Sequence, residues 1–491
     1  MKSVKFRNAV LIVSIALLLA SRATAEERYE RFDRDLQWDG HNNRSTAFPC
    51  RMTRQDFGYN PDTSRAGGAA GEVGGIIQSA ADPAWYAKSI PVCDFDKVLS
   101  ASGKIRIPEN LSDGHFLVGF FNSKTALGWR TPNSVTLRFR GRGEDGREIF
   151  FVFADYMTQN WRAGGLAIGG LDPQTGRERP VGFKTGKSVH TWSIRYDPRG
   201  AGGKGTLTGT VDDQSITIPL DSGHKVDGAT FDRFGLLNVM KYAESPTLAW
   251  IDDVTINGKT EDFSVDPGWE GHGNRRGYED CLVRPRFDFG YSPTNFAGGA
   301  ASGELGGLVF RGDCRYADRL ACYGDRLNKL TLERPLKASG KICLRRGISD
   351  STTLIGFYHS LDSMVVNPSQ QYGTPENFLG AAIEGPSRDG FYLYPMYRIF
   401  GDQQSNGRGK NPPSLLPDGK SHNWTLEYTP ETPDRNGRIT VSLDAQSGSI
   451  DLPRDHKAAN AFFDRFGIVT TWVDGNGQLI YFDDLTYTSK Q

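Results

Sequence analysis

The chain has 491 residues, which is too long for one ordinary domain and fits two or three. Its 58 Gly and 25 Pro disfavour a mainly helical protein, because both residues break helices. Charged residues make up 24% and aromatic residues 11%, so the composition is not that of a disordered chain. The 58 Lys and Arg residues balance 58 Asp and Glu residues, which excludes the usual polybasic nucleic-acid binder.

Residues 1–25 predict a secretory signal peptide. Lys2, Lys5 and Arg7 form a positive start, and the apolar stretch 9–20 that follows is too short for a comfortable membrane span. An A-x-A cleavage site ends at Ala25. An uncleaved N-terminal anchor is the alternative. We expect a secreted, periplasmic or cell-surface protein with no later membrane span.

An internal duplication dominates the rest of the sequence. The stretch WDGHNNR at 38–44 returns as WEGHGNR at 269–275, and FDRFG at 231–235 is repeated letter for letter at 463–467. The matches keep their order and spacing along the whole chain. They predict two homologous domains, residues 26–262 and 263–491, each long enough to have its own core.

Period-two alternation of apolar and polar residues predicts strands throughout both units. It is clearest in residues 134–140 (SVTLRFR), 206–211, 424–428 and 439–443. Turn signals rich in Gly, Pro, Asp and Asn separate these runs, and no convincing amphipathic helix is present. The fold class predicted for each unit is an all-β sandwich.

The two ends of each unit carry a family resemblance. Each unit opens on Phe-x-x-Asp followed by Trp and closes on an apolar-Asp-Asp-apolar-Thr strand; the opening residues are Phe32, Asp35 and Trp38, then Phe263, Asp266 and Trp269. This pattern resembles the concanavalin A-like lectin/glucanase superfamily, including laminin-G-like and carbohydrate-binding jelly rolls. The resemblance implies two tandem jelly-roll domains whose first and last strands lie side by side. The whole repeat also looks like a recurring type of exported environmental-bacterial protein.

The same resemblance implies a structural Ca²⁺ near the last strand of each unit, and no other cofactor is required. Asp252 or Asp253, and Asp483 or Asp484, are the implied metal ligands. Adjacent residues of a strand point to opposite faces, so at most one Asp of each pair should face inward. The alternative is an exposed acidic pair that flanks a turn.

Aromatic residues beside Arg are the candidates for carbohydrate binding. Sugars stack their apolar faces on aromatic rings, and Arg binds carboxylate or sulfate groups in bidentate fashion. The candidates are Trp129, Arg130, Tyr156, Trp161 and Arg162 in the first unit, and Tyr392, Tyr394, Tyr397 and Arg398 in the second. They favour a polysaccharide or glycan partner, and the Arg residues suit an anionic one; the alternative is that these aromatics are core residues.

Motifs for catalysis are largely missing. The E-x-D-x-x-E run of jelly-roll glucanases and the R-x-E-L-R and Q-[IV]-H runs of alginate-lyase-type sandwiches are absent. Only scattered weak candidates remain: Glu72, Glu304, His41, His272 and His359. For Glu72 and Glu304 we favour a structural role as acceptors of backbone N–H groups. The Asp-Arg of FDRFG predicts a structural ion pair or turn brace, because both units share it.

The six cysteines permit disulfides in an exported chain. The first unit holds only Cys50 and Cys93, which we expect to pair if either is oxidised. The second unit holds four cysteines with three pairings open. Buried free thiols are the alternative.

The function that the sequence favours is an exported carbohydrate-binding protein that recognises a polysaccharide or surface glycan through tandem lectin-like domains. Two alternatives stay open. One is a polysaccharide lyase or glycoside hydrolase with a non-standard active site. The other is a structural or adhesive surface protein.

Overall fold

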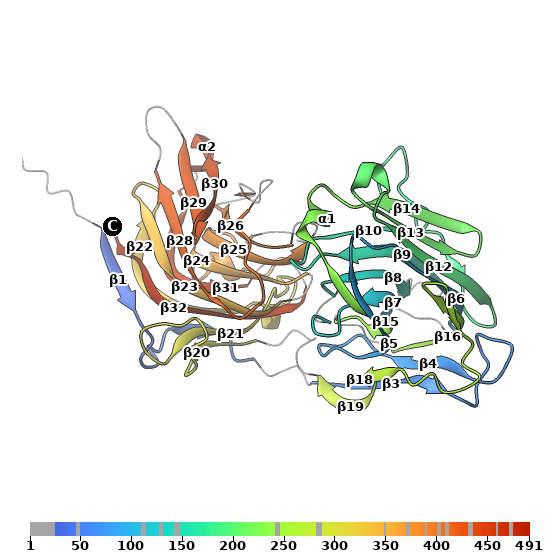
Figure 1. Cartoon of the computed structure of the whole chain (residues 1–491). Helices are drawn as coiled ribbons and strands as arrows, with labels where there is room; N and C mark the ends of the chain where they lie inside the picture. Colours follow the sequence, from blue (N-terminus) through green and yellow to red (C-terminus); the bar gives the residue numbers. More distant parts are fainter. Residues whose placement is uncertain are drawn as a thin grey trace, which may run out of the picture.

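In a computed structural model the chain folds into two β-sandwiches that lie side by side (Figure 1). The structure describes residues 25–45, 50–109, 114–126, 131–141, 148–240, 246–280, 287–347, 350–369, 374–387, 390–399, 404–407, 412–430, 436–457, 460–470 and 475–491. The predicted all-β fold class is confirmed. The signal peptide lies outside the described residues except for its last residue. None of the helices within these ranges is long and apolar enough to cross a membrane.

The first sandwich consists of two antiparallel sheets. One contains β3 (Arg51–Asn60), β4 (Glu72–Ile77), β6 (Leu99–Arg106), β12 (Val189–Asp197), β13 (Thr206–Val211), β14 (Gln214–Pro219), β16 (Thr247–Ile256), β17 (Lys259–Glu261) and β19 (Arg275–Asp280), in the order β14-β13-β12-β6-β16-β4-β3-β19 with β17 beside β16. The other, which we call the β7 sheet, contains β5 (Trp85–Asp94), β7 (His115–Phe121), β8 (Ser134–Gly141), β9 (Ile149–Met157), β10 (Ala163–Ala167), β11 (Phe183–Lys184), β15 (Thr230–Asn238) and β18 (Glu270–His272), in the order β10-β9-β8-β7-β15-β5-β18 with β11 beside β9.

The second sandwich repeats this arrangement. Its first sheet contains β1 (Glu26–Glu30), β20 (Asp288–Ser292), β21 (Glu304–Phe310), β23 (Leu336–Gly347), β28 (Ser421–Thr429), β29 (Gly437–Leu443), β30 (Gln446–Leu452) and β32 (Gly477–Lys490), in the order β20-β21-β32-β23-β28-β29-β30 with β1 beside β32. Its other sheet, which we call the β24 sheet, contains β2 (Asp39–His41), β22 (Cys322–Thr331), β24 (Thr352–Tyr358), β25 (Phe378–Ser387), β26 (Gly390–Arg398), β27 (Gln404–Asn406) and β31 (Phe462–Val469), in the order β2-β22-β31-β24-β25-β26-β27. Short helical turns connect strands in both halves: η1 (Ala201–Gly203), α1 (His224–Asp227), η2 (Ala317–Arg319), η3 (Asp362–Met364) and α2 (Arg454–Lys457).

Alternating patterns form the half-buried strands that they predict. In β12 the side chains of His190, Trp192, Ile194 and Tyr196 are buried, and every second residue between them is more exposed. Strand β8 differs, since all but one of its residues are buried. Its Arg138 is buried because it pairs with buried Asp155, with Nε and Oδ2 2.6 Å apart. Both faces of this part of the β7 sheet are therefore covered.

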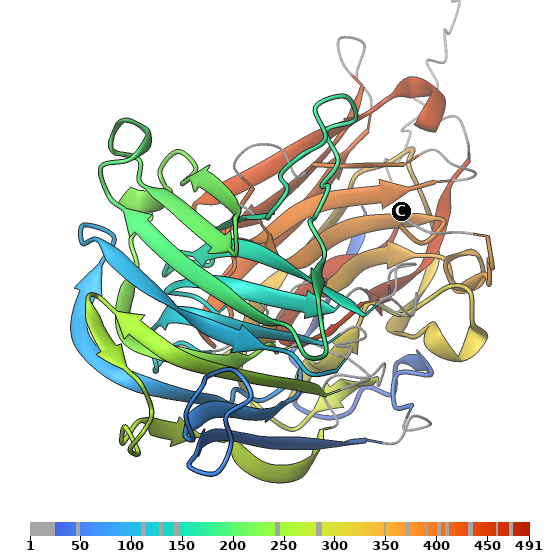
Figure 2. The same ribbon diagram turned by 90° about the vertical axis from the view of Figure 1, so that its right-hand side faces the viewer.

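The opening segment of each repeat completes the sandwich of the other repeat. Strand β1 pairs with β32, and Phe32 and Trp38 lie in the core of the second sandwich. In the same way β18 pairs with β5, β19 pairs with β3, and Trp269 lies in the core of the first sandwich. Figure 1 shows β1 at the outer edge of the second sandwich and β19 below β3, and Figure 2 shows the first sandwich in front of the second. The packing thus crosses the sequence division between residues 262 and 263.

The expected pairing of Cys50 with Cys93 is wrong. Cys93 has a free thiol in the structure, whereas Cys50 is disulfide-bonded. Among the described residues of the second sandwich, Cys314, Cys322 and Cys343 are also free and buried. Burial raises the pKa of each of these three thiols, which disfavours the reactive thiolate.

Candidate functional site

The β24 sheet has one face toward the core and one face away from it. Ile355 and Phe357 of β24 pack into the main core, whereas Leu354 and Tyr358 belong to a separate cluster on the outer face. Gly324, Gly356 and their paired neighbours on β31 and β25 form a row of glycines across the middle of this outer face, and the side chains of Tyr358 and Phe378 lie over it. Polar groups gather at one end of it.

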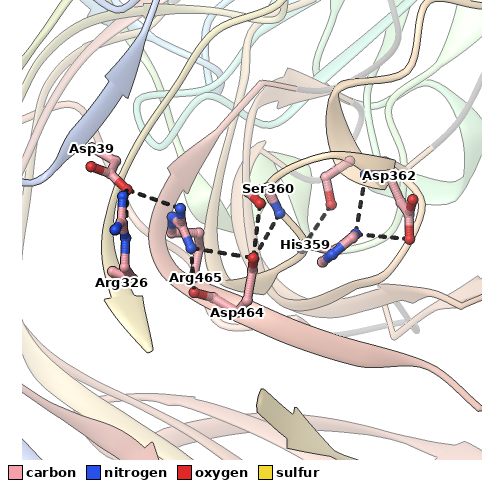
Figure 3. A network of polar contacts seen from close by, with 8 residues as sticks. Asp39, Arg326, His359, Ser360, Asp362, Asp464 and Arg465 are labelled. Carbon is pink, nitrogen blue, oxygen red and sulfur yellow. Dashed lines mark hydrogen bonds and ion pairs between the residues drawn. The ribbon is translucent and has the colours of Figure 1, made fainter. Parts of the chain in front are cut away.

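Seven polar side chains form a connected row at this end (Figure 3). They come from β2, β22, β31 and the loop that follows β24, so three of the four contributing segments are fixed strands. We call them the polar row: Asp39, Arg326, Arg465, Asp464, Ser360, His359 and Asp362.

Asp39 joins two arginines at one end of the polar row. Its Oδ2 accepts hydrogen bonds from Arg326 Nε and Nη2 at 3.2 and 3.0 Å, and from Arg465 Nη2 at 2.9 Å. The Arg326 side chain is 74% exposed, whereas that of Arg465 is 13% exposed. Arg465 is therefore held in place, and Arg326 is available to a ligand.

His359 and Asp362 lie at the other end of the polar row. Asp464 accepts hydrogen bonds from the backbone N–H and the hydroxyl of Ser360, both at 2.8 Å, and its Oδ2 is 3.2 Å from Arg465 Nη1. His359 Nδ1 is 2.8 Å from Asp362 Oδ2, and the imidazole packs against the ring of Phe462 with centroids 4.4 Å apart.

The first sandwich repeats only part of the polar row. Arg233 Nη2 donates to Glu270 Oε2 at 2.9 Å, and Asp232 accepts two hydrogen bonds at 2.7 Å from Ser123. The Asp-Arg pair of FDRFG is an ion pair in both sandwiches, with Nη1 and Oδ2 3.4 Å apart for Arg233 and Asp232 and 3.2 Å apart for Arg465 and Asp464, which confirms the predicted brace. The arginine of this pair also binds a carboxylate in the opening segment of the other repeat.

Arg326 and His359 have no counterpart in the first sandwich. The residue paired with Arg465 on the neighbouring strand is Arg326, but the residue paired with Arg233 is Ser89. Likewise Asn122 precedes Ser123 where His359 precedes Ser360. Because the first sandwich is braced without these side chains, the fold does not require them.

The other catalytic candidates lie apart from this row. His41 is exposed on β2 with Nε2 3.1 Å from the side-chain nitrogen of Asn42, and exposed His272 stacks on Trp85 with ring centroids 5.6 Å apart. Glu72 and Glu304 begin β4 and β21, which belong to the sheets opposite the β7 and β24 sheets. These residues are not assembled into one site.

A pair of buried carboxylates lies in the first sandwich. Glu72 is fully buried, and its Oε2 accepts the N–H of Ala66 at 2.7 Å, whereas its Oε1 has no hydrogen-bond partner among the described residues. Asp252 is 2% exposed and lies so close to Gly67 that a Cβ there would be 1.4 Å from its Oδ2. Burial, together with the charges of Asp253 and Glu72, raises the pKa of Asp252 to about 6.

The second sandwich contains the equivalent pair. Glu304 accepts the N–H groups of Phe296 and Ala297 at 2.9 and 2.7 Å, and fully buried Asp483 has an Oδ2 without a partner among the described residues. Burial and the charges of Asp484 and Glu304 raise the pKa of Asp483 to about 7. Both Glu side chains thus accept backbone N–H groups, which is the structural role that the sequence favours.

These carboxylate pairs fit a hard cation. Asp253 and Asp484 point away from the buried Asp and pair with Lys104 at 2.5 Å and Lys341 at 3.2 Å, so neither Lys neutralises the buried pair directly. Two carboxylates and an unpartnered oxygen in a glycine-lined loop suit Ca²⁺, which takes oxygen ligands from carboxylates and backbone carbonyls. The described residues contain no group of three or more His, Cys, Asp or Glu that could hold a metal. Any further ligands would therefore be backbone or hydroxyl oxygens.

The predicted sugar-stacking tyrosines are buried. Tyr156, Tyr392, Tyr394 and Tyr397 expose 1, 2, 4 and 0% of their surface, so none offers a ring face to a ligand in solution. Tyr156 and Tyr397 bind histidines through their hydroxyls, and Tyr394 donates to Glu384 Oε2 at 2.6 Å. Arg398 is also buried and donates to the carbonyl of Thr374 at 3.1 Å.

Of the two predicted Trp-Arg pairs, Trp129 and Arg130 lie outside the described residues. Trp161 is 8% exposed and packs on Phe391 of the second sandwich, with ring centroids 5.1 Å apart. Arg162 follows it and is half-buried. Arg326 was missed by the sequence analysis because its segment, CYGDRLNKL, has no Trp or Tyr beside the Arg.

Comparisons with known proteins add only distant likenesses. No family model matches the sequence, and no curated protein matches it. Among solved structures, domains LG4-5 of the mouse laminin α1 chain align over 88% of this chain and 91% of that chain, with 12% identity and a TM-score of 0.25. An alginate lyase from Alteromonas sp. 272 aligns over 48% of this chain and 95% of that one, with 11% identity and a TM-score of 0.23. The Emp47p carbohydrate recognition domain aligns over 41% and 89%, with 12% identity and a TM-score of 0.25. Scores this low carry no argument, so the two-sandwich architecture rests on the strand pairings described above.

Proposed function

We propose that this chain is an exported carbohydrate-binding protein and that the polar row of the second sandwich binds the glycan. The observation that carries the proposal is that Arg326, His359 and Asp362 extend a brace that the first sandwich makes without them. Sugar hydroxyls donate and accept hydrogen bonds at once, and the row offers both kinds of partner close together. Its exposed Arg326 also suits a carboxylate or sulfate of an anionic polysaccharide.

We further propose that each buried carboxylate pair holds a Ca²⁺ ion. In this role Asp252 with Glu72, and Asp483 with Glu304, supply the carboxylate ligands. The ion would neutralise two buried acids and fix the loops that contain Gly67 and Gly299, each packed against the Asp carboxylate. No step of glycan binding is assigned to the ion itself.

The test is retention of residues 26–491 on immobilised neutral, uronic-acid and sulfated polysaccharides, with Kd measured by titration for the one that is retained. Arg326→Ala and His359→Ala are compared with the unchanged chain. Loss of one exposed charged hydrogen-bonding group should cost about 1 kcal/mol, which weakens binding about fivefold. His359→Ala should have a similar effect because it removes the imidazole from the row and leaves Asp362 Oδ2 with the Asn377 amide as a hydrogen-bond donor at 2.6 Å.

Arg438→Ala is the matched control. Arg438 is an exposed arginine on β29 that binds Asp451 through Nε and Nη2 at 2.7 and 3.1 Å, so it resembles Arg326 but lies on the opposite sheet. It should leave the Kd unchanged. Equal weakening by Arg326→Ala and Arg438→Ala, or none by either, would contradict a site at the polar row. New reducing ends in the same samples would instead favour an enzyme.

A further inference from the structure

A cavity of about 170 Å³ lies between the two sandwiches and shares no residue with the polar row. Pro83, Trp161 and Met240 of the first sandwich and Pro417 of the second give it mostly apolar walls. Arg346, near the end of β23, supplies a cation to the same cavity. A cavity of about 150 Å³ in a protein holds a benzene molecule, so this one has room for a single six-membered ring.

Arg346 has few partners for its five N–H donors. Its guanidinium makes a single hydrogen bond to the described part of the chain, from Nη2 to the carbonyl of Ala81 across the inter-sandwich boundary. The two nearby carboxylates are engaged elsewhere: Asp82 binds Arg276 at 2.6 Å, and Asp280 accepts the N–H of Ala81 at 2.6 Å. Burial lowers the pKa of Arg346 although both acids oppose that shift. Asp82 also lines the cavity, but no carboxylate among the described residues is hydrogen-bonded to the guanidinium of Arg346.

Trp161 lines the same cavity with a strained backbone. Its φ angle is +64°, in the left-handed region that bulky residues avoid. The Trp161 ring is held edge-on against Phe391, which fixes its position. The chain therefore places a rigid aromatic wall next to an under-coordinated guanidinium.

We propose that this cavity binds a carboxylate carried on a six-membered ring, either a uronic acid or an aromatic acid. The carboxylate would pair with Arg346 in bidentate fashion, and the ring would lie among the apolar walls formed by Trp161, Pro83 and Pro417. The site is independent of the polar row, and its ligand contacts both sandwiches. An occupied cavity would thus help to fix the angle between them.

The test uses residues 26–491 with four small probes and saturation-transfer NMR, followed by calorimetric titration. D-Glucuronate and D-glucose form one matched pair, and benzoate and benzamide form the other. We expect one or both carboxylates to bind at least tenfold more tightly than the neutral partner, and the arm that binds identifies the ring type. Arg346→Gln should remove this preference, and Arg346→Lys should keep part of it.

Two further readouts keep the outcome unambiguous. Arg326→Ala should bind the small carboxylate as the unchanged chain does, although it loses polysaccharide affinity, so the two sites fail separately. Arg346 forms a hydrogen bond across the boundary between the two sandwiches. If Arg346→Gln unfolds because it loses this bond, Arg346→Lys is used in its place. Equal binding of acid and neutral probes, no binding of either acid, or full affinity in both Arg346 variants would overturn the proposal.

Discussion

The buried carboxylates are the residues whose charge the fold tolerates least. Asp252 and Asp483 have pKa values raised to about 6 and about 7, above the ordinary value of 3.8. Between these values the folded protein binds more protons than the unfolded chain. The stability that these groups contribute is therefore complete below about pH 4 and is lost as the pH rises through about 6 to 7. A bound cation would stabilise the ionised pair and so reverse this dependence of stability on pH.

This gives a prediction for the double variant Asp252→Asn, Asp483→Asn. In the presence of a chelator, the variant should be more stable than the unchanged chain at about pH 8, by about 3–4 kcal/mol per site, and should show no advantage at about pH 4. Saturating Ca²⁺ should raise the Tm of the unchanged chain and leave that of the variant where it is. Thermal unfolding followed by circular dichroism compares the two proteins at both pH values, with chelator and with Ca²⁺.

Two results would contradict this prediction. An equal rise in Tm with Ca²⁺ in both proteins would place the cation elsewhere. A chelated chain whose stability increases between about pH 4 and about pH 8 would mean that the buried pair is already compensated. Glu72 is kept unchanged in both proteins, since its bond to the Ala66 N–H supports the loop directly.

The sequence could identify the residues of the carboxylate pairs but not the glycan site. The Asp-Asp pairs and the Gly-flanked Glu residues recur in both repeats, and strand alternation correctly predicts that one Asp of each pair is buried. Tyr392 and Tyr394 are predicted at a sugar site because sugars stack on aromatic rings, but they lie in a buried cluster on the outer face of the β24 sheet. Met364 of η3 packs against that cluster, a tertiary contact that no local sequence pattern reveals.

At the scale of elements, the FDRFG strands hold the neighbouring opening segments. Arg465 of β31 joins Asp39 of β2 to Asp464, and Arg233 of β15 joins Glu270 of β18 to Asp232. Strands as short as β2 and β18, with three residues each, cannot be stable through backbone pairing alone. The arginine in each sandwich supplies charged contacts that fix such a strand in register.

Arg465→Ala and Arg233→Ala should therefore lower stability by similar amounts. Each removes charged hydrogen bonds from a side chain that is 13% or 16% exposed, so we expect a loss of about 1–3 kcal/mol in the free energy of unfolding. Urea denaturation measures it, and exposed Arg438→Ala should cost less than about 1 kcal/mol. Only Arg465→Ala should also weaken polysaccharide binding. A loss of binding in Arg233→Ala without unfolding would contradict the division of roles between the sandwiches.

At the scale of the whole molecule, the duplication was visible in the sequence and the exchange of segments was not. The repeat predicts two copies of one sandwich, and the hydrophobic alternation predicts their strands. Neither pattern says which sandwich receives Trp38, because the two copies offer homologous sites to the opening segment. The choice depends on the direction in which the chain leaves the opening segment. Residues 51–56 belong to β3, where they pair antiparallel with residues 275–280 of the other repeat.

This arrangement predicts different behaviour for two fragments that are nearly equal in length. Residues 51–280 contain every described strand of the first sandwich together with Phe263 and Trp269, so this fragment should fold as a monomer with cooperative unfolding. Residues 26–262 lack Trp269, β18 and β19. The loss of such a core aromatic costs about 3–5 kcal/mol, a large part of the stability of a domain.

The fragment 26–262 nevertheless carries a homologous opening segment, in which Trp38 corresponds to Trp269, Asp39 to Glu270 and Arg44 to Arg275. Only residues 45–50 separate this segment from the start of β3 at Arg51, so folding back onto its own sandwich would require a reversal within that short connection. The segment can reach the vacant site of a second copy, as Arg44 reaches Asp288 at 2.5 Å in the whole chain. We therefore expect residues 26–262 to form a dimer that exchanges opening segments, and Trp38→Ala to leave this fragment monomeric and unstable. Light scattering after size exclusion distinguishes the states, and a stable monomer of residues 26–262 would show that each repeat can close on itself.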